Sequence, residues 1–310
     1  MQDAGSGSAD GSANPLPTKM AQDIIAIICD CDGTLCPDTS DRLVRELGID
    51  SDDFWKNQVA ALVADGWDPP LAYLNQLLVA ARETAHGGLT LGLLNKVGAG
   101  VEFYPGALDF VPRLRNMLAA TPEYVEANVT VEWFIISSGI EAVLRSTPLD
   151  PGANEIFGCA FHYDETGTAV AVKRTVTFTE KTKLVYAINK GISGAELSRN
   201  PYRVNDYMAS EARRIPFRNM IYVGDGPSDI PCFSMIRNLG GKAVGVTPPD
   251  DSDFRRPYEL AEGQRLTVGP YTANYQDGSD LFRMMARMVT GIADTILEDR
   301  EHNLRRAPTH

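Results

Sequence analysis

Near its start the chain reads Ile24-Ile25-Ala26-Ile27-Ile28-Cys29-Asp30-Cys31-Asp32-Gly33-Thr34-Leu35. The apolar run is short, rich in β-branched residues and free of polar side chains, which is typical of a strand buried on both faces of a parallel sheet. It ends at Asp30, and Asp32 follows two positions later. Gly33 allows a sharp turn that can bring backbone amides around an anion. The segment therefore predicts a buried strand with two carboxylates at its carboxyl end.

Taken alone, an Asp-Gly pair after a strand is also ordinary turn chemistry. Two further apolar strands, at residues 129–136 and 220–223, run into polar loops of the same kind. The first loop is Ser137-Ser138-Gly139-Ile140 and the second is Gly224-Asp225-Gly226-Pro227-Ser228-Asp229. With a fourth strand at 243–246 and helices between the strands, the pattern predicts a Rossmann-like, doubly wound α/β sheet. Ligands of such sheets bind beyond the carboxyl ends of the strands, where all three loops fall.

The remaining periodicity divides the chain into four ranges. Residues 1–20 are rich in Gly, Ser, Ala and Asp and are expected to form a disordered tail without a secretory signal. Residues 21–38 and 103–310 are assigned to the α/β core, including helices at 107–119, 183–190 and 280–300 and an antiparallel strand pair within 157–178. Residues 39–102 follow a helical pattern, with helices at 51–64 and from Pro69 onward, and are predicted to form an inserted cap.

Composition limits the possible partners. The 310 residues are 44% apolar and carry 29 basic against 41 acidic side chains, for a net charge of -12. This charge disfavours nucleic acid and anionic membranes, and no apolar run is long enough for a membrane span. Five cysteines, an odd number in a chain too long to need disulfides, favour the reducing cytoplasm. We expect a small phosphorylated metabolite as partner; the sequence does not specify an oligomeric state.

Polar residues outside the first loop could bind an anion. Ser137 ends a strand before a predicted helix, where its hydroxyl and free helix amides form an anion site, although helix capping is the commoner role of serine there. Lys181 and Lys183 lie at the start of a helix, which is an unfavourable place for a cation. One of these lysines therefore needs a functional reason for its position, while a solvated surface is the default for either.

Four aspartates, at positions 30, 32, 225 and 229, are expected to converge at one edge of the sheet. Packing so much negative charge together is costly without a cation. Oxygen ligands without histidine favour Mg²⁺ over zinc or copper. The sequence therefore predicts a Mg²⁺ site.

The ordered set of motifs resembles the haloacid dehalogenase (HAD) superfamily, specifically its phosphatase branch. The resemblance rests on Asp30-Cys31-Asp32-Gly33-Thr34, Ser137, Lys181 and the segment from Gly224 to Asp229, in the order of the family, and it spans roughly residues 22 to 250. The hairpin-like stretch between Ser137 and Lys181 is similar to the phosphoserine phosphatase group. The predicted helical insert matches the cap of the family in location but not in motif.

The resemblance implies a role for each matched residue. Asp30 would be the nucleophile that becomes an aspartyl phosphate, and Asp32 the general acid and base. Asp30, Asp225 and the backbone carbonyl of Asp32 would hold Mg²⁺. The phosphate would be bound by the remaining polar set, Ser137, Ser138, Gly139 and Lys181, with Asp229, Gly33, Thr34, Gly224 and Gly226 in support. The stretch from Lys181 to Asp225 is longer than expected in the family. Lys183 is close enough in sequence to be the phosphate-binding lysine in place of Lys181.

Several alternatives stay open at this point. A phosphotransferase or phosphomutase could use the same intermediate, and a non-catalytic phosphate-dependent binding module could share the scaffold. A dehalogenase would need neither Asp32 nor the metal loop. Cys31 and Cys36 lack the second ligand pair of a zinc site and favour packing, with possible sensitivity to oxidation. The cap is expected to determine which substrate is bound. Trp55, Trp67 and Tyr73 could line its pocket, and packing in its core is the alternative for each of them.

Overall fold

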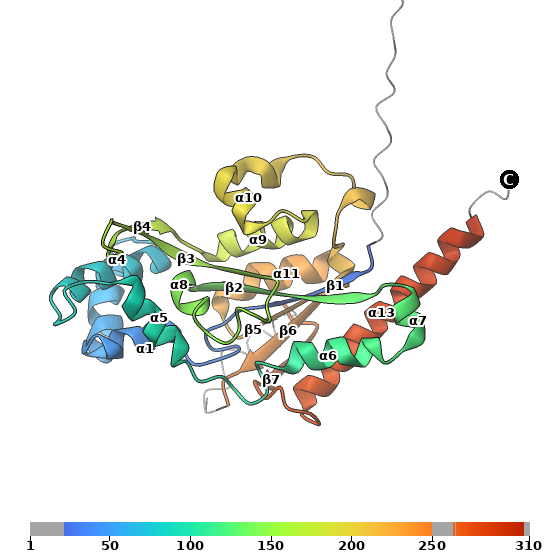
Figure 1. Ribbon diagram of the computed structural model, residues 1–310, viewed down its shortest axis with the longest axis horizontal. Coiled ribbons are helices and arrows are strands. Elements are labelled where there is room, and N and C mark those ends of the chain that lie inside the picture. Colours follow the sequence, from blue (N-terminus) through green and yellow to red (C-terminus); the bar gives the residue numbers. More distant parts are fainter. Residues whose placement is uncertain (1–21, 250–262, 264, 307–310) are drawn as a thin grey trace, which may run out of the picture.

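The computed structural model describes residues 22–249, 263 and 265–306 (Figure 1). The predicted tail at residues 1–20 lies outside this range. The described strands form one seven-stranded sheet in the order β4-β3-β2-β1-β5-β6-β7, parallel throughout except for the β3–β4 pair. The strands are β1 (Ile24–Cys29), β2 (Thr130–Ile140), β3 (Glu155–Tyr163), β4 (Ala169–Arg174), β5 (Met220–Gly224), β6 (Lys242–Thr247) and β7 (Val268–Thr272). The predicted α/β fold class is confirmed, and β7 is an element that the sequence analysis missed.

Strand β1 lies at the centre of the sheet, between β2 and β5. Its side chains alternate between two hydrophobic clusters, with Ile25, Ile27 and Cys29 in one and Ala26 and Ile28 in the other. Both faces of the strand are therefore buried, which explains why its apolar run has no polar residue.

Helices cover both faces of the sheet (Figure 1). On one face lie α6 (Phe110–Ala119), α7 (Pro122–Glu126) and α13 (Asp280–Arg306); on the other lie α9 (Phe178–Lys190), α10 (Gly194–Arg199) and α11 (Ile230–Asn238). None of the described helices is long and apolar enough to cross a membrane.

The segment between β1 and β2 contributes a group of helices beyond the carboxyl end of β1 (Figure 1). They are α1 (Thr39–Glu46), α2 (Ser51–Asp53), a π-helix at Phe54–Val59, α3 (Ala60–Ala64), α4 (Pro69–Arg82) and α5 (Leu91–Ala99). Asp38, Asp50, Asp68 and Thr90 cap α1, α2, α4 and α5 by accepting backbone hydrogen bonds.

These helices dock on the β3–β4 hairpin. The amide of Leu91 donates to the carbonyl of Gly167 at 3.1 Å, and the amide of Ala169 donates to the carbonyl of Leu89 at 2.7 Å. Their buried side chains belong to the same hydrophobic cluster as one face of the sheet. The division of the chain into a core and a cap at residues 39–102 remains a prediction, because one continuous cluster spans both.

Two local predictions differ from the structure at the site. Strand β2 does not end at Ile136 but continues through Ser137, Ser138 and Gly139 to Ile140, because a register shift between Ile136 and Ile140 lets it keep pairing with β3. The helix that follows, α8 (Glu141–Leu144), is only four residues long. Helix α9 begins at Phe178 and not at Lys183, since Thr177 caps it through the amide of Glu180.

Candidate functional site

The carboxyl ends of β1, β2 and β5 open into one cavity of about 460 Å³. The polar residues that line it come from the three predicted loops and from the start of the helical segment. They are Asp30, Asp32, Asp38, Ser40, Ser137, Ser138, Gly139, Asp225, Gly226 and Ser228. The parallel strands thus bring together residues that lie far apart in the sequence.

Asp30 sits at the end of β1 and is only 5% exposed. Its backbone amide donates to the carbonyl of Val223 at 2.9 Å, which ties the loop to β5. Its Oδ1 accepts from the amide of Cys31 at 2.7 Å, and its Oδ2 accepts from Nζ of Lys181 at 2.7 Å. The carboxylate is therefore held in one orientation at the floor of the cavity.

Lys181 is completely buried, which is rare for a lysine. Besides Asp30, its Nζ donates to Oδ1 of Asp229 at 2.8 Å and to Oγ of Ser228 at 3.2 Å. Burial lowers the pKa of Lys181, but the Asp229 and Asp30 carboxylates outweigh it and the pKa is raised. Lys183, by contrast, is 31% exposed and pairs with Glu180. The sequence left open which of the two lysines reaches the site, and in the structure it is Lys181.

Asp229 is fully buried and connects Lys181 to the sheet. Its Oδ1 also accepts from the hydroxyl of Tyr222 at 2.7 Å. Tyr222 and Ser228 were not singled out from the sequence as site residues. The signal for Tyr222 was available, because a tyrosine in the otherwise apolar β5 must find a partner for its buried hydroxyl.

Asp225 completes a group of three carboxylates with Asp30 and Asp229, whose ligand oxygens all lie within 4.8 Å of one another. The hydroxyl of Thr34 donates to Oδ1 of Asp225 at 3.2 Å. Gly33, with φ of +73°, leaves room for this approach, since a Cβ atom there would lie 2.3 Å from Oδ2 of Asp225. Gly224 has a matching role, since its Cβ would lie 2.3 Å from Oδ2 of Asp229.

The charges of this group fit a divalent cation. Asp30 and Asp229 share the ammonium group of Lys181, so a single positive charge faces three carboxylates. Burial raises the pKa of Asp30 to about 7 despite the lowering effect of Lys181, and burial and the charge of Asp30 raise the pKa of Asp225 well above its ordinary value. Three converging carboxylates form the hard oxygen donor set that Mg²⁺ prefers, so the residues present fit that ion.

Asp32 lies apart from the three-carboxylate group. Its Oδ1 accepts from the amide of Thr39 at 2.8 Å, and a Cβ atom on Gly139 would lie 2.7 Å from its Oδ2. Burial and the nearby charge of Asp38 raise the pKa of Asp32 to about 8. Its side chain can therefore hold a proton near neutral pH, in a position that lines the cavity. Thr39 and Asp38 were not assigned to the site from the sequence.

The serines at the end of β2 have different environments. Ser137 is fully buried, lines the cavity and accepts from the amide of Gly139 at 2.9 Å. The hydroxyl of Ser138 instead donates to the carbonyl of Val176 at 2.8 Å. Ser137 can therefore offer its hydroxyl hydrogen to an anion in the cavity, whereas the hydroxyl of Ser138 is engaged in holding β2 to the segment before α9.

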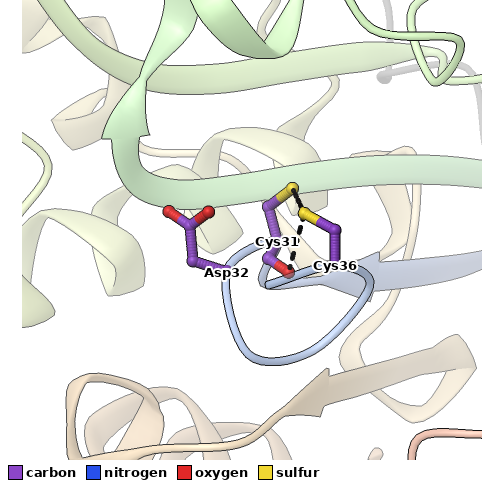
Figure 2. Close-up of side chains that lie close together, drawn as sticks. All are labelled: Cys31, Asp32 and Cys36. Atoms are coloured by element: carbon purple, nitrogen blue, oxygen red, sulfur yellow. Dashed lines mark hydrogen bonds between the residues drawn. The ribbon is translucent and has the colours of Figure 1, made fainter. Parts of the chain in front are cut away.

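Cys31 and Cys36 form a pair of buried thiols beside Asp32. Their Sγ atoms lie 3.6 Å apart. Figure 2 shows the two sulfur atoms turned toward each other, with the Asp32 carboxylate to one side. The three side chains also lie close enough to ligate a metal. Hydrogen bonding to Cys36 and burial raise the pKa of Cys31 well above its ordinary value, so these thiols stay protonated and pack as small apolar groups.

Two of the three aromatic residues considered in the sequence reach the cavity. Trp55 and Tyr73 line it, with ring centroids 5.7 Å apart. Trp67 is absent from the described lining and packs against the hydrophobic cluster.

No family model matches the sequence. An uncharacterized protein of Borreliella burgdorferi is 24% identical over 291 residues, which cover 86% of this chain and 97% of that protein. A HAD family hydrolase of Salmonella enterica serovar Typhi is 18% identical with a TM-score of 0.46; the alignment covers 75% of this chain and 63% of that one.

Two phosphoserine phosphatase structures superpose with TM-scores of 0.50. A substrate-bound complex is 13% identical and aligns over 84% of this chain and 96% of its own. A probable phosphoserine phosphatase of Vibrio cholerae, unliganded, is 11% identical and aligns over 92% of this chain and 69% of its own. Likeness at this level of identity establishes the fold: the chain has a HAD-like α/β fold.

Proposed function

We propose that this protein is a Mg²⁺-dependent phosphoric monoester hydrolase that forms an aspartyl phosphate on Asp30. The observation that carries the proposal is the contact of Asp30 with Lys181 at 2.7 Å, inside a group that also contains Asp225 and Asp229. A nucleophilic carboxylate must approach an anionic phosphate, so its own charge has to be offset. The buried Lys181 offsets the charge of Asp30, and the two further carboxylates beside it can hold a cation.

In the first step an Asp30 carboxylate oxygen attacks phosphorus, and the bond from phosphorus to the ester oxygen breaks. The departing oxygen takes a proton from Asp32, whose raised pKa keeps that proton available. Lys181 offsets the charge of Asp30, and the hydroxyl of Ser137 donates to a phosphate oxygen. Mg²⁺, held by Asp30, Asp225 and the backbone carbonyl of Asp32, would supply positive charge between carboxylate and phosphate.

In the second step water attacks the phosphorus of the aspartyl phosphate. Asp32, now ionised, takes a proton from that water, and the bond between phosphorus and the Asp30 oxygen breaks. Inorganic phosphate leaves and both aspartates return to their starting states. Asp229 and Tyr222 hold Lys181 in place through both steps. Five buried free thiols agree with a cytoplasmic location for this reaction.

The test is phosphate release from a panel of phosphomonoesters, with and without Mg²⁺, by the parent protein and by Asp30→Asn. We expect release that requires Mg²⁺ and falls by at least about 10³-fold in the variant. The exposed Asp52→Asn is the matched control, with activity like the parent. Metal-independent release, or full activity in Asp30→Asn, would contradict the proposal. Transfer to an added alcohol in place of water would identify a phosphotransferase, and silence across the panel a binding module.

A further inference from the structure

Part of the wall of the cavity is apolar and aromatic. It is formed by Trp55, Val59, Pro69, Pro70 and Tyr73, all from the helical segment between β1 and β2. A cavity of about 460 Å³ has room for a compact organic group beside a phosphate. These five residues are therefore positioned to meet the organic part of a substrate.

The polar atoms of both aromatic residues are already used within the protein. Nε1 of Trp55 donates to Oδ1 of Asp41 at 3.1 Å, and the hydroxyl of Tyr73 donates to the carbonyl of Ser138 at 2.6 Å. What these side chains can offer to a ligand is ring surface. Ring surface attracts apolar groups and, through its quadrupole, cations.

Asp38 adds an accessible negative charge to the same cavity. Its side chain is exposed, and its Oδ1 caps α1 by accepting from the amides of Ser40 and Asp41 at 2.8 and 2.9 Å. Lys181, the cation nearest to the carboxylates in the part of the chain that the structure describes, lies at the floor, fully buried and bonded to Asp30, Ser228 and Asp229.

The described residues that line the cavity include neither lysine nor arginine. Arg42 and Arg45, the arginines closest in sequence to Asp38, line a neighbouring cavity of about 430 Å³ that Asp38 also lines. Arg45 is paired with Asp41 at 2.7 Å. A carboxylate on the substrate would therefore face Asp38 without a described cation to pair with it. Juxtaposed like charges are strongly unfavourable in a recognition site.

Resting on the proposed function, we infer that the substrate is the phosphate ester of an amino alcohol, with a positively charged ammonium group and no carboxylate. The ammonium lies against the Trp55 and Tyr73 rings, and Asp38 supplies the opposite charge. Phosphate and ammonium thus bind within the same cavity, on different groups of residues. The apolar prolines accommodate the carbon chain or methyl groups on the nitrogen.

Four substrates that differ in single features test this inference. O-Phosphoserine differs from O-phosphoethanolamine only by its carboxylate, phosphocholine adds three methyl groups, and propyl phosphate replaces the ammonium by a methyl group. We expect kcat/KM to be at least about 10-fold higher for phosphoethanolamine and phosphocholine than for phosphoserine, with propyl phosphate between them. Phosphoserine equal to or better than phosphoethanolamine overturns the inference.

A fifth substrate, p-nitrophenyl phosphate, separates the two levels of the proposal. If it is hydrolysed in an Asp30-dependent and Mg²⁺-dependent manner while phosphoserine is preferred over the amino alcohol esters, the proposed function stands and the substrate class is wrong. If none of the five esters is hydrolysed, both are overturned.

Two variants test which residues distinguish between these substrates. Asn caps helices as well as Asp, so Asp38→Asn removes the charge and keeps the cap, and we expect it to lower the preference for phosphoethanolamine over phosphoserine about 3-fold or more. Trp55→Leu should lower the ratio of phosphocholine to propyl phosphate turnover by about 2- to 30-fold. Trp67→Leu is the control, since Trp67 packs outside the lining, and should leave that ratio unchanged. Unchanged ratios in both test variants overturn the assignment.

Discussion

Nζ of Lys181 lies 2.7 Å from Oδ2 of Asp30, although the two residues are 151 positions apart in the chain. The contact joins the first turn of α9 to the end of β1. Because these groups are buried, removing Lys181 leaves the carboxylates of Asp30 and Asp229 without their shared cation in the protein interior.

Replacing Lys181 by methionine should therefore affect stability as well as activity. We expect a loss of about 3–5 kcal/mol in the free energy of unfolding, because Asp30 and Asp229 lose their shared cation. Urea denaturation followed by circular dichroism measures the change. Lys183→Met, at a position 31% exposed and paired with Glu180, is the matched control with less than about 0.5 kcal/mol of change. Equal losses in the two variants would contradict the assignment of Lys181.

Gly33 is expected to be intolerant of a side chain for two reasons that can be separated. Gly33→Ala places a Cβ atom 2.3 Å from Oδ2 of Asp225 at a φ of +73°, whereas Gly48→Ala has nearly the same φ, +74°, and no atom within 4 Å. Gly48→Ala should cost about 1 kcal/mol from backbone strain alone. Gly33→Ala should cost more and also weaken Mg²⁺ binding, measured by calorimetric titration. Mg²⁺ binding as tight as in the parent would show that Asp225 does not need this space.

Magnesium should stabilise the fold by binding at the three-carboxylate group, where Asp30 and Asp225 are its proposed carboxylate ligands. At a free Mg²⁺ concentration about 100 times its Kd, binding contributes about 2.7 kcal/mol, which thermal unfolding with and without the ion reports without any assay of activity. Asp225→Asn should lose most of this shift. Without the ion the same variant should be more stable than the parent, because it removes one of three clustered negative charges. A full Mg²⁺ shift in Asp225→Asn would argue against this site; Asp52→Asn is the control.

Asp41 accepts a hydrogen bond from Trp55 in the wall of the cavity, and the strength of this support depends on pH. Burial acts to raise its pKa, but hydrogen bonds from Ser51, Arg45 and Trp55 prevail and hold the pKa below the ordinary value of 3.8. A lowered folded-state pKa contributes stability above the unfolded value and loses it as the pH falls through the folded one. The difference in unfolding free energy between the parent and Asp41→Asn should thus be largest near neutral pH and shrink below about pH 4. A difference independent of pH would exclude this role for the carboxylate.

Much of the framework follows from local sequence. The apolar runs that end at Asp30 and Gly224 predict parallel strands because only buried strands dispense with polar residues. Gly33 predicts a turn because glycine tolerates a positive φ, and the structure has a φ of +73° there. The α/β class and the loops at the carboxyl ends could be predicted for this reason. Strand β7 could not, since Val268–Thr272 contains Gly and Pro and owes its place to pairing with β6.

The pairing of particular side chains was decided by the tertiary structure. Local periodicity treats Lys181 and Lys183 alike at the start of a helix, and only the packing of α9 against the sheet buries the first and exposes the second. The same holds for Tyr222 with Asp229 and for Trp55 and Tyr73 at the cavity. The sequence by itself determined which chemical groups end each strand. Which of them meet depended on long-range packing, because a contact between distant residues leaves no periodic trace along the chain.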